Sequence, residues 1–202
     1  MRLRGLYAIT PDSADSAMLL WKVERALEGG LALLQYRNKT ASRKVRLMQA
    51  ARIAELARRH GVPLIVNDDV ELALRIDAHG VHLGRDDGDL ASARRQLPGR
   101  ILGVSCYDRL ELAQAALAAG ADYVAFGSVY ASGTKPGAVR APLSLFGAAR
   151  ALGVQLCAIG GITAENAPQL VAAGADLLAV IVDLFDAPDI AERARHYAKV
   201  FS

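Results

Sequence analysis

The sequence predicts a single-domain α/β protein, a (β/α)8 TIM barrel that spans residues 1–202. Three features lead to this prediction: short apolar runs recur at intervals of roughly 20 to 30 residues, segments with helical spacing separate them, and the junctions between the two repeat. A chain of 202 residues lies near the lower size limit of this fold. It is long enough for one sizeable core and short for two domains.

The expected strands are runs rich in Ile, Val, Leu and Tyr that lack a clean polar alternation. Such runs are typical of strands that are covered on both faces, as in a parallel sheet. They span residues 6–10, 31–37, 64–68, 81–84, 101–105, 123–128, 156–160 and 177–182.

The expected helices lie between these runs and after the last of them, at residues 16–27, 42–59, 70–76, 90–97, 110–119, 142–152, 164–173 and 189–200. Ser42 and Asp189 are suitable N-cap residues, and Gly61, Gly120 and Gly153 are suitable helix stops. Because each crossover returns the chain to the same end of the sheet, eight strand–helix pairs favour parallel strands.

A four-residue motif occurs twice, as Ala119–Asp122 before one strand and as Ala173–Asp176 before another. We interpret it as a repeated corner between a helix and a strand, in which glycine tolerates a positive φ. An open doubly wound sheet is the alternative fold. It usually has fewer repeats, and no GxGxxG motif follows the first strand here.

Composition excludes several classes of protein. A hydrophobic fraction of 52% argues against disorder, and no run of about 18 apolar residues lacks a charge, which argues against a membrane span. The net charge of +3 comes without a basic run, so no nucleic-acid partner is expected. Two cysteines are too few for a disulfide framework. The first residues lead straight into an apolar run without a secretory signal, so we expect a cytoplasmic protein.

In a barrel of this kind the chemistry lies where the strands end. At the end of the second expected strand, Gln35, Arg37 and Lys39 alternate and so share one side of an extended chain. Two cations beside an amide suit a polyphosphate attached to a heterocycle. A solvated loop with ordinary charges is the alternative for this short motif.

Carboxylates follow the next two strands, in Asn67–Asp69 and Arg85–Asp87. Carboxylates at neighbouring strand ends suit Mg²⁺, which takes one or two of them together with substrate phosphates. Helix N-capping is the competing role for Asp68, Asp69 and Asp87. Together with the basic triplet, the sequence favours the metal.

Later strand ends carry hydroxyls and glycines. Ser105 ends the fifth expected strand, and the loop at residues 127–137 contains glycines, hydroxyls and Lys135, a composition suited to a phosphate cradle. Gly160 and Gly161 would allow close backbone approach to a phosphate, with packing glycines as the alternative.

The motifs for other chemistries are missing. Ser105 has no obvious base partner, Cys106 reads as a packing residue, and no HExxH or CxxC motif supports zinc. His82 is placed to reach the barrel mouth, although a hydrogen-bonded core histidine is the commoner case.

The ordered set of strand ends resembles the thiamine-phosphate synthase family over almost the whole chain. Each motif is weak alone, and the series in order is highly specific. The motifs are Leu6–Pro11, Leu34–Lys39, Asn67–Asp69, Gly80–Asp87, Gly103–Ser105, Gly127–Tyr130, Gly133–Pro136 and Ala158–Ile162.

The resemblance implies a Mg²⁺-dependent transferase on a TIM barrel. The family joins 4-amino-2-methyl-5-hydroxymethylpyrimidine diphosphate to thiazole phosphate, which forms thiamine phosphate and releases pyrophosphate. The reaction is dissociative, so it needs charge neutralisation on the leaving group and no protein nucleophile, which agrees with the absence of a triad.

The resemblance also implies roles for individual residues. Asp68 and Asp87 would bind Mg²⁺. Catalysis would depend on Arg37, Lys39, Ser105 and Lys135. The pyrimidine diphosphate would contact Gln35, Tyr36, Arg37, Asn38, Lys39, Asn67, Ser105 and Lys135. Thiazole phosphate would contact Ser132, Gly133, Thr134, Gly161, Ile181 and Val182.

The sequence departs from the family near the end of the eighth strand, where members commonly carry serine and this chain has Val182 followed by Asp183. A backbone N–H contact would survive there, whereas an inward-pointing Asp183 would repel phosphate. Two other functions stay open: an isomerase like the related thiazole tautomerase, and a non-catalytic phosphate-ligand-binding or regulatory barrel. The expected partners are small phosphorylated molecules, with no nucleic acid and no membrane; whether the chain forms a homo-oligomer stays open.

Overall fold

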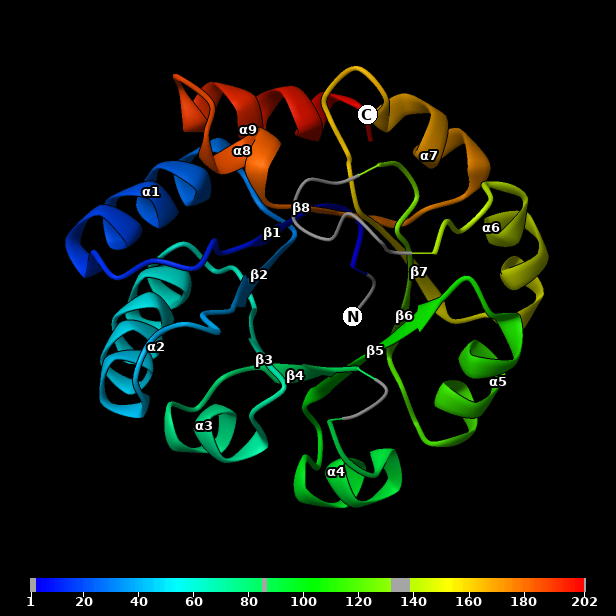
Figure 1. Ribbon diagram of the computed structural model, residues 1–202, viewed down its shortest axis with the longest axis horizontal. Helices are drawn as coiled ribbons and strands as arrows, with labels where there is room; N and C mark the ends of the chain where they lie inside the picture. Colours follow the sequence, from blue (N-terminus) through cyan, green and yellow to red (C-terminus); the bar gives the residue numbers. More distant parts are fainter. Residues whose placement is uncertain (1–2, 85–86, 132–138, 202) are drawn as a thin grey trace.

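The computed structural model describes residues 3–84, 87–131 and 139–201. Within these ranges, parallel strands close into a barrel in chain order, with β1 beside β8. The strands are β1 (Gly5–Ile9), β2 (Leu33–Tyr36), β3 (Leu64–Asn67), β4 (Gly80–Leu83), β5 (Ile101–Tyr107), β6 (Tyr123–Phe126), β7 (Gln155–Ile159) and β8 (Leu177–Val180). Figure 1 looks down this barrel. The predicted TIM barrel is confirmed, and the open sheet is excluded.

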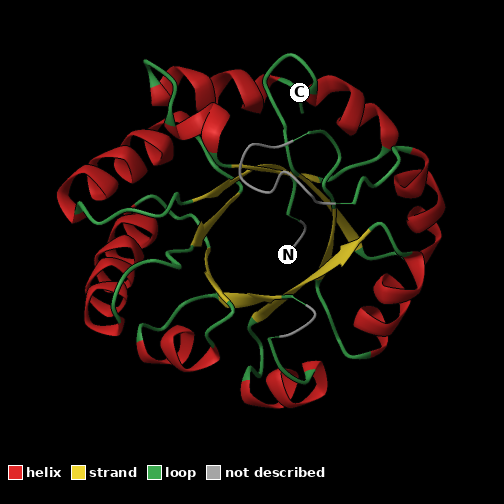
Figure 2. Ribbon diagram, viewed as in Figure 1, coloured by secondary structure: helices red, strands yellow, loops and turns green. Residues whose placement is uncertain are grey.

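The helices form a ring outside the strands (Figure 2). They are α1 (Ser16–Gly29), α2 (Arg43–Arg59), α3 (Val70–Arg75), α4 (Leu90–Gln96), α5 (Leu110–Ala118), α6 (Ser144–Ala149) with the 3-10 turn η1 (Arg150–Leu152), α7 (Ala167–Ala173), α8 (Val182–Phe185) and α9 (Ile190–Lys199). The short helix α8 was not expected. The eighth strand was predicted to run to Val182, but it ends at Val180 and α8 follows it.

Local sequence signals determine several helix ends. Ser42 accepts a hydrogen bond from the Val45 N–H, and Asp189 accepts one from the Glu192 N–H, so both predicted N-caps are confirmed. Asp15 caps α1 in the same way.

Apolar side chains pack on both sides of the strands. Outside the barrel, residues such as Leu6 and Ala8 contact the helices. Inside it, Tyr7, Ile65 and Tyr123 belong to a separate buried cluster. Because alternate residues of a strand point to opposite faces, most strands supply apolar side chains to both layers, which explains the continuous apolar runs in the sequence. Strand β4 differs, since its buried His82 is polar.

The repeated motif forms the same corner at both places. Gly120 and Gly174 have φ angles of +88° and +114°. The aspartate that follows each corner accepts a hydrogen bond from the N–H of a neighbouring strand, Asp122 from Leu102 and Asp176 from Leu156. The motif therefore ties each strand to its neighbour at the end where the strands begin. None of the described helices has the length and apolar character that crossing a bilayer requires.

Candidate active site

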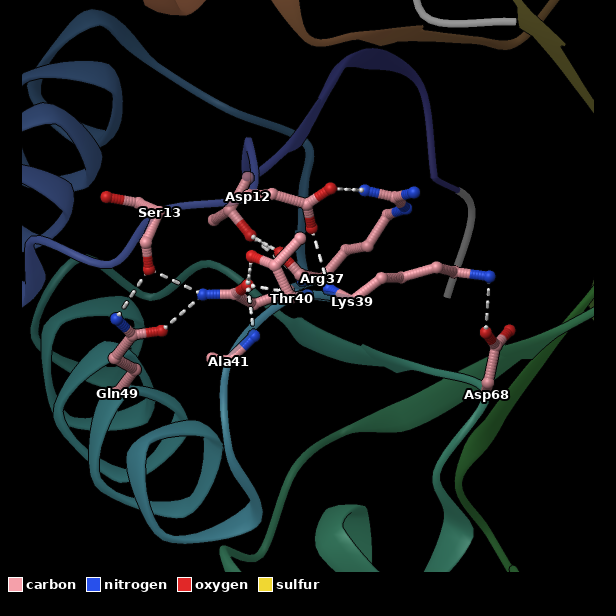
Figure 3. Close-up of polar contacts among 10 residues, drawn as sticks. Asp12, Ser13, Arg37, Lys39, Thr40, Ala41, Gln49 and Asp68 are labelled. Carbon is pink, nitrogen blue, oxygen red and sulfur yellow. Dashed lines mark hydrogen bonds and ion pairs between the residues drawn. The ribbon is translucent and has the colours of Figure 1, made fainter.

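The loop after β2 is held by the segment that follows β1. The Thr10 hydroxyl donates to the Arg37 carbonyl oxygen and accepts from the Arg37 N–H, both at 2.8 Å. Asp12 accepts from the Lys39 N–H at 2.6 Å and from the Arg37 guanidinium at 3.0 Å (Figure 3). These contacts fix the backbone of the basic loop, so that the two cations are presented from a defined position.

Lys39 reaches from this loop to the end of β3. Its Nζ lies 3.1 Å from an Asp68 carboxylate oxygen, as Figure 3 shows. The Asp87 side chain, from the loop after β4, lies within hydrogen-bonding reach of Asp68. Its carboxylate also accepts from the Gly84 N–H at 2.8 Å. The structure thus brings one cation and two carboxylates together from three strand ends.

Asp68 carries two signs of a functional position. Its φ of +63° places a non-glycine residue in the left-handed region, which costs on the order of 1–3 kcal/mol and is typical of functional sites. The pKa of its carboxyl is raised, first by burial and then by the neighbouring Asp87, while Lys39 opposes the shift. A carboxylate whose charged form is disfavoured by burial and by a neighbouring acid is suited to binding a cation.

Helix capping, the competing role, belongs to other aspartates. Asp69 accepts from the Leu72 N–H at the start of α3, and Asp89 accepts from the Ser92 N–H at the start of α4. Capping therefore accounts for Asp69, whereas Asp68 and Asp87 face each other.

Two of the residues expected to contact the pyrimidine diphosphate point away from the rim. The Tyr36 hydroxyl donates to Gln49 of α2 at 2.9 Å. The Asn38 amide donates to Gln49 and to the Ser13 carbonyl oxygen, and its own oxygen accepts from the Thr40 and Ala41 N–H groups (Figure 3). Both side chains are nearly inaccessible. They brace the loop from behind, so only their backbone is available for contact with a substrate.

Gln35 and Ser105 lie at the two ends of a buried polar chain inside the barrel. Gln35 donates to the Tyr7 hydroxyl at 2.5 Å, and His82 Nε2 lies 2.8 Å from Ser105 Oγ. His82 is thus a hydrogen-bonded core histidine, the commoner of the two cases considered from the sequence. It is also connected to the rim through Ser105. Sequence reasoning predicted no functional role for Tyr7 or Tyr123, because each resembles an ordinary core residue of an apolar strand. Asn67 ends β3, between Gln35 and His82 in the order of the strands.

The loops after β6 and β7 pack tightly together. The Val129 and Tyr130 N–H groups donate to the carbonyl oxygens of Ile159 and Gly160. A Cβ on Gly160 would come within 2.2 Å of the Ser128 hydroxyl oxygen, and one on Gly161 within 2.3 Å of the Ala131 carbonyl oxygen. Packing therefore accounts for both glycines, and phosphate contact by Gly161 stays a prediction. Ser132, Gly133, Thr134 and Lys135 lie outside the described residues, as do Arg85 and Asp86.

The segment after β8 shows how the chain accommodates its departure from the family pattern. Val182 is exposed at the start of α8. Asp183 points outward: both of its carboxylate oxygens lie 2.9 Å from an Arg193 nitrogen, and the Tyr197 hydroxyl donates to it at 2.7 Å. The Asp183 carboxylate therefore pairs with residues of α9. It does not point inward, where it would repel a phosphate.

The donor set fits the Mg²⁺ that the family implies. Within residues 3–84, 87–131 and 139–201, no three acidic, histidine or cysteine side chains gather into a metal site. The pair Asp68 and Asp87 supplies the number of carboxylates that Mg²⁺ takes when substrate phosphates complete its coordination.

Carboxylates and cations at the carboxyl-end rim of a parallel barrel define an enzyme that acts on small phosphorylated substrates. Comparison with known proteins gives the family. The model of the thiamine monophosphate synthase family matches residues 6–184, so the chain belongs to this family.

The sequence similarity extends over almost the full length of the relatives. The chain is 62% identical to the thiamine-phosphate synthase of Aromatoleum aromaticum over 202 residues, which cover 99% of this chain and 97% of the relative. It is 59% identical to that of Chromobacterium violaceum, with 99% and 97% covered. Among solved structures, thiamine phosphate pyrophosphorylase from Pyrococcus furiosus superposes with a TM-score of 0.86 at 32% identity, with 98% and 96% covered. The chain is therefore an enzyme of thiamine biosynthesis. The relatives are named as synthases, which disfavours the isomerase and the regulatory barrel.

Proposed function

We propose that the rim described above catalyses the joining of 4-amino-2-methyl-5-hydroxymethylpyrimidine diphosphate to thiazole phosphate. The observation that carries this assignment is the meeting of Lys39, Asp68 and Asp87 at neighbouring strand ends. A diphosphate needs cations around it, and a divalent cation between carboxylates and phosphate oxygens supplies the strongest of them.

The pyrimidine diphosphate is assigned to the side of the rim formed by β2, β3 and β5. Arg37 and Lys39 contact the diphosphate together with Lys135, while Gln35, Asn67 and Ser105 contact the ring. In support, Gln35 and Ser105 are joined through the barrel interior, and the Arg37–Lys39 backbone is clamped by Thr10 and Asp12. The Tyr36 and Asn38 contacts are restricted to backbone atoms.

The thiazole phosphate is assigned to the opposite side of the rim, at the loops after β6, β7 and β8. Ser132, Gly133 and Thr134 are the side-chain and backbone contacts carried over from the family, with the backbone of Gly161, Ile181 and Val182 completing the phosphate cradle. The outward turn of Asp183 supports this placement, because it keeps a negative charge away from the cradle.

The proposed chemistry needs no protein nucleophile. The bond between the pyrimidine methylene carbon and the diphosphate oxygen breaks, and the electron pair leaves with pyrophosphate. The thiazole nitrogen then donates its lone pair to the methylene cation. Arg37, Lys39 and Lys135 stabilise the charge that develops on the leaving group, and Gln35 and Ser105 hold the ring in line with the thiazole. Asp68 and Asp87 would hold Mg²⁺, which adds charge neutralisation at the diphosphate when bound.

The test is a coupled assay on purified protein with both substrates and Mg²⁺, in which pyrophosphate and thiamine phosphate are measured. We expect equal amounts of the two products. Asp68→Ala and Lys135→Ala should each lower kcat by about a hundredfold or more while the thermal midpoint stays close to that of wild type. Glu71→Ala is the matched control for Asp68, since Glu71 is exposed and pairs with the exposed Arg43 on the outer surface. A normal rate in Asp68→Ala would refute the metal assignment.

A further inference from the structure

Five side chains from five strands form one hydrogen-bonded chain across the inside of the barrel. The Gln35 Nε2–Tyr7 Oη distance is 2.5 Å, and Tyr7 Oη–Tyr123 Oη is 2.7 Å. Tyr123 Oη lies 2.9 Å from His82 Nδ1, and His82 Nε2 lies 2.8 Å from Ser105 Oγ. The two ends of this hydrogen-bonded chain, Gln35 and Ser105, are two of the three residues assigned above to the pyrimidine ring.

Burying this hydrogen-bonded chain of side chains is energetically costly, and a glycine on a neighbouring strand leaves space for it. Interiors of such barrels are ordinarily filled by branched aliphatic side chains, and buried polar groups are costly unless they are fully hydrogen-bonded. Tyr7 and Tyr123 are nevertheless almost completely buried there. A Cβ on Gly103 of β5 would come within 2.0 Å of the Tyr123 ring, so β5 omits a side chain where this ring crosses the barrel. The His82 ring stacks on Tyr123, with centroids 5.6 Å apart.

The direction of the hydrogen bonds follows from one end of the chain. The Gln35 Nε2 group only donates, so the Tyr7 oxygen accepts and its own hydrogen goes to Tyr123. Tyr123 in turn donates to His82 Nδ1, so the imidazole hydrogen is on Nε2, directed at Ser105. Burial raises the pKa of both tyrosine hydroxyls, so they keep their protons.

This direction sets what each end offers to a ligand. The Ser105 oxygen accepts from His82, so its own hydrogen is left to donate. At the other end, the Gln35 side-chain nitrogen is engaged with Tyr7. Its side-chain oxygen has no hydrogen-bond partner among the described residues and is available to accept. An aminopyrimidine presents the complementary pair, an amino group that donates and ring nitrogens that accept.

We propose that Tyr7, Tyr123 and His82 are positioning residues that hold Gln35 as an acceptor and Ser105 as a donor toward the aminopyrimidine ring. The proposal rests on the proposed function, which places the ring between these two residues. It assigns ring recognition to the barrel interior and diphosphate recognition to the rim. Interrupting the chain in its middle should therefore weaken binding of the ring without affecting the diphosphate.

The experiment compares Tyr123→Phe with Ile65→Val. Ile65 lies in the same buried cluster, and its shortening has a stability cost of the same order as the loss of one hydroxyl hydrogen bond, so it controls for general damage to the interior. Calorimetry with Mg²⁺ measures the affinity for the pyrimidine diphosphate and, separately, for inorganic pyrophosphate. Tyr123→Phe should lose about three- to tenfold in affinity for the first and none for the second, with an unchanged KM for thiazole phosphate.

A double-mutant cycle tests the coupling to Ser105. If the chain orients the serine, Ser105→Ala should cost less in the Tyr123→Phe background than in wild type. Tyr7→Phe, at the next link, should show the same selectivity for the ring and stands in if Tyr123→Phe does not fold. Equal losses for both ligands, or additive effects of the two substitutions, would overturn the proposal. A wild-type protein that binds the pyrimidine diphosphate but forms no thiamine phosphate would overturn the proposed function alone, because the affinity comparison would still be readable.

Discussion

The contact between Asp183 and α9 allows a quantitative prediction for Asp183→Ala. The substitution removes the nearer acceptor of the buried Tyr197 hydroxyl, at 2.7 Å, and leaves the Ile162 carbonyl oxygen at 3.5 Å. A hydrogen bond to a charged group contributes about 1.5–3 kcal/mol. It also removes the partner of Arg193, whose side chain is 29% exposed, so that this part is screened to about 1 kcal/mol or less. The expected loss in the free energy of unfolding is therefore about 2–4 kcal/mol.

Thermal denaturation checks this value. For a chain of this length each 1 kcal/mol shifts Tm by about 2–4 °C, so Asp183→Ala should lower Tm by about 5–15 °C. Asp186→Ala is the matched control: it lies just after the same helix and pairs with Lys22 at 3.5 Å, but its side chain is 64% exposed. Such a surface pair contributes about 0–1 kcal/mol, which is about 4 °C at most.

The same variant tests the direction in which Asp183 points. If its carboxylate faced the thiazole phosphate, removing it would relieve repulsion and lower the KM for that substrate. We expect no such decrease at a temperature where the variant is folded. A Tm within about 2 °C of that of Asp186→Ala, or a several-fold lower KM, would show that the outward anchoring is wrong.

Further predictions concern the metal site, the thiols and one histidine. Asp68→Asn keeps a residue type that tolerates the left-handed region and removes one of two facing charges, so Tm should stay level or rise while a Mg²⁺ titration of activity shows a half-saturation at least about tenfold higher; a lower Tm with unchanged Mg²⁺ dependence would contradict this. Burial raises the pKa of Cys106 to about 12 and that of Cys157 further, so an aromatic disulfide reagent at pH 8 should label neither in the folded protein and both after denaturation. Burial lowers the pKa of His79, whose Nδ1 accepts from the Leu64 N–H, so its stabilising contribution is complete above the unfolded pKa near 6.5 and is lost as the pH falls through the folded value. Unfolding midpoints between pH 7 and pH 5 should accordingly fall less in His79→Gln than in wild type.

The parts of the fold that the sequence predicts well are those governed by local physics. Apolar runs gave the strands and their parallel order, and Ser42 and Asp189 gave helix starts because N-capping depends on residues three positions apart. Helix α8 was missed because its four residues are too few to show a helical period. The predicted eighth strand ran on to Val182 because apolar residues continue past the true end at Val180.

The candidate site divides in the same way. Alternation predicted that Gln35, Arg37 and Lys39 share one side of an extended chain, although β2 ends at Tyr36. No local pattern could show that Asp183 turns outward, because its partners lie on a later helix. The positioning role proposed for Tyr123 could not be predicted from the sequence for a related reason. A tyrosine in an apolar run resembles a core residue, and only the closed barrel brings its hydroxyl beside the Tyr7 hydroxyl and the His82 ring nitrogen.

The paired corners at Asp122 and Asp176 have a consequence for how this chain can change over time. Each aspartate joins two neighbouring strands at the end where the strands begin, far from the loops assigned to substrate binding. Because these contacts lie at the other end of the strands, the catalytic loops can change in length or exchange residues without loss of the contacts that hold the strands together. Selection can thereby refine ligand preference and architectural robustness as two nearly independent traits.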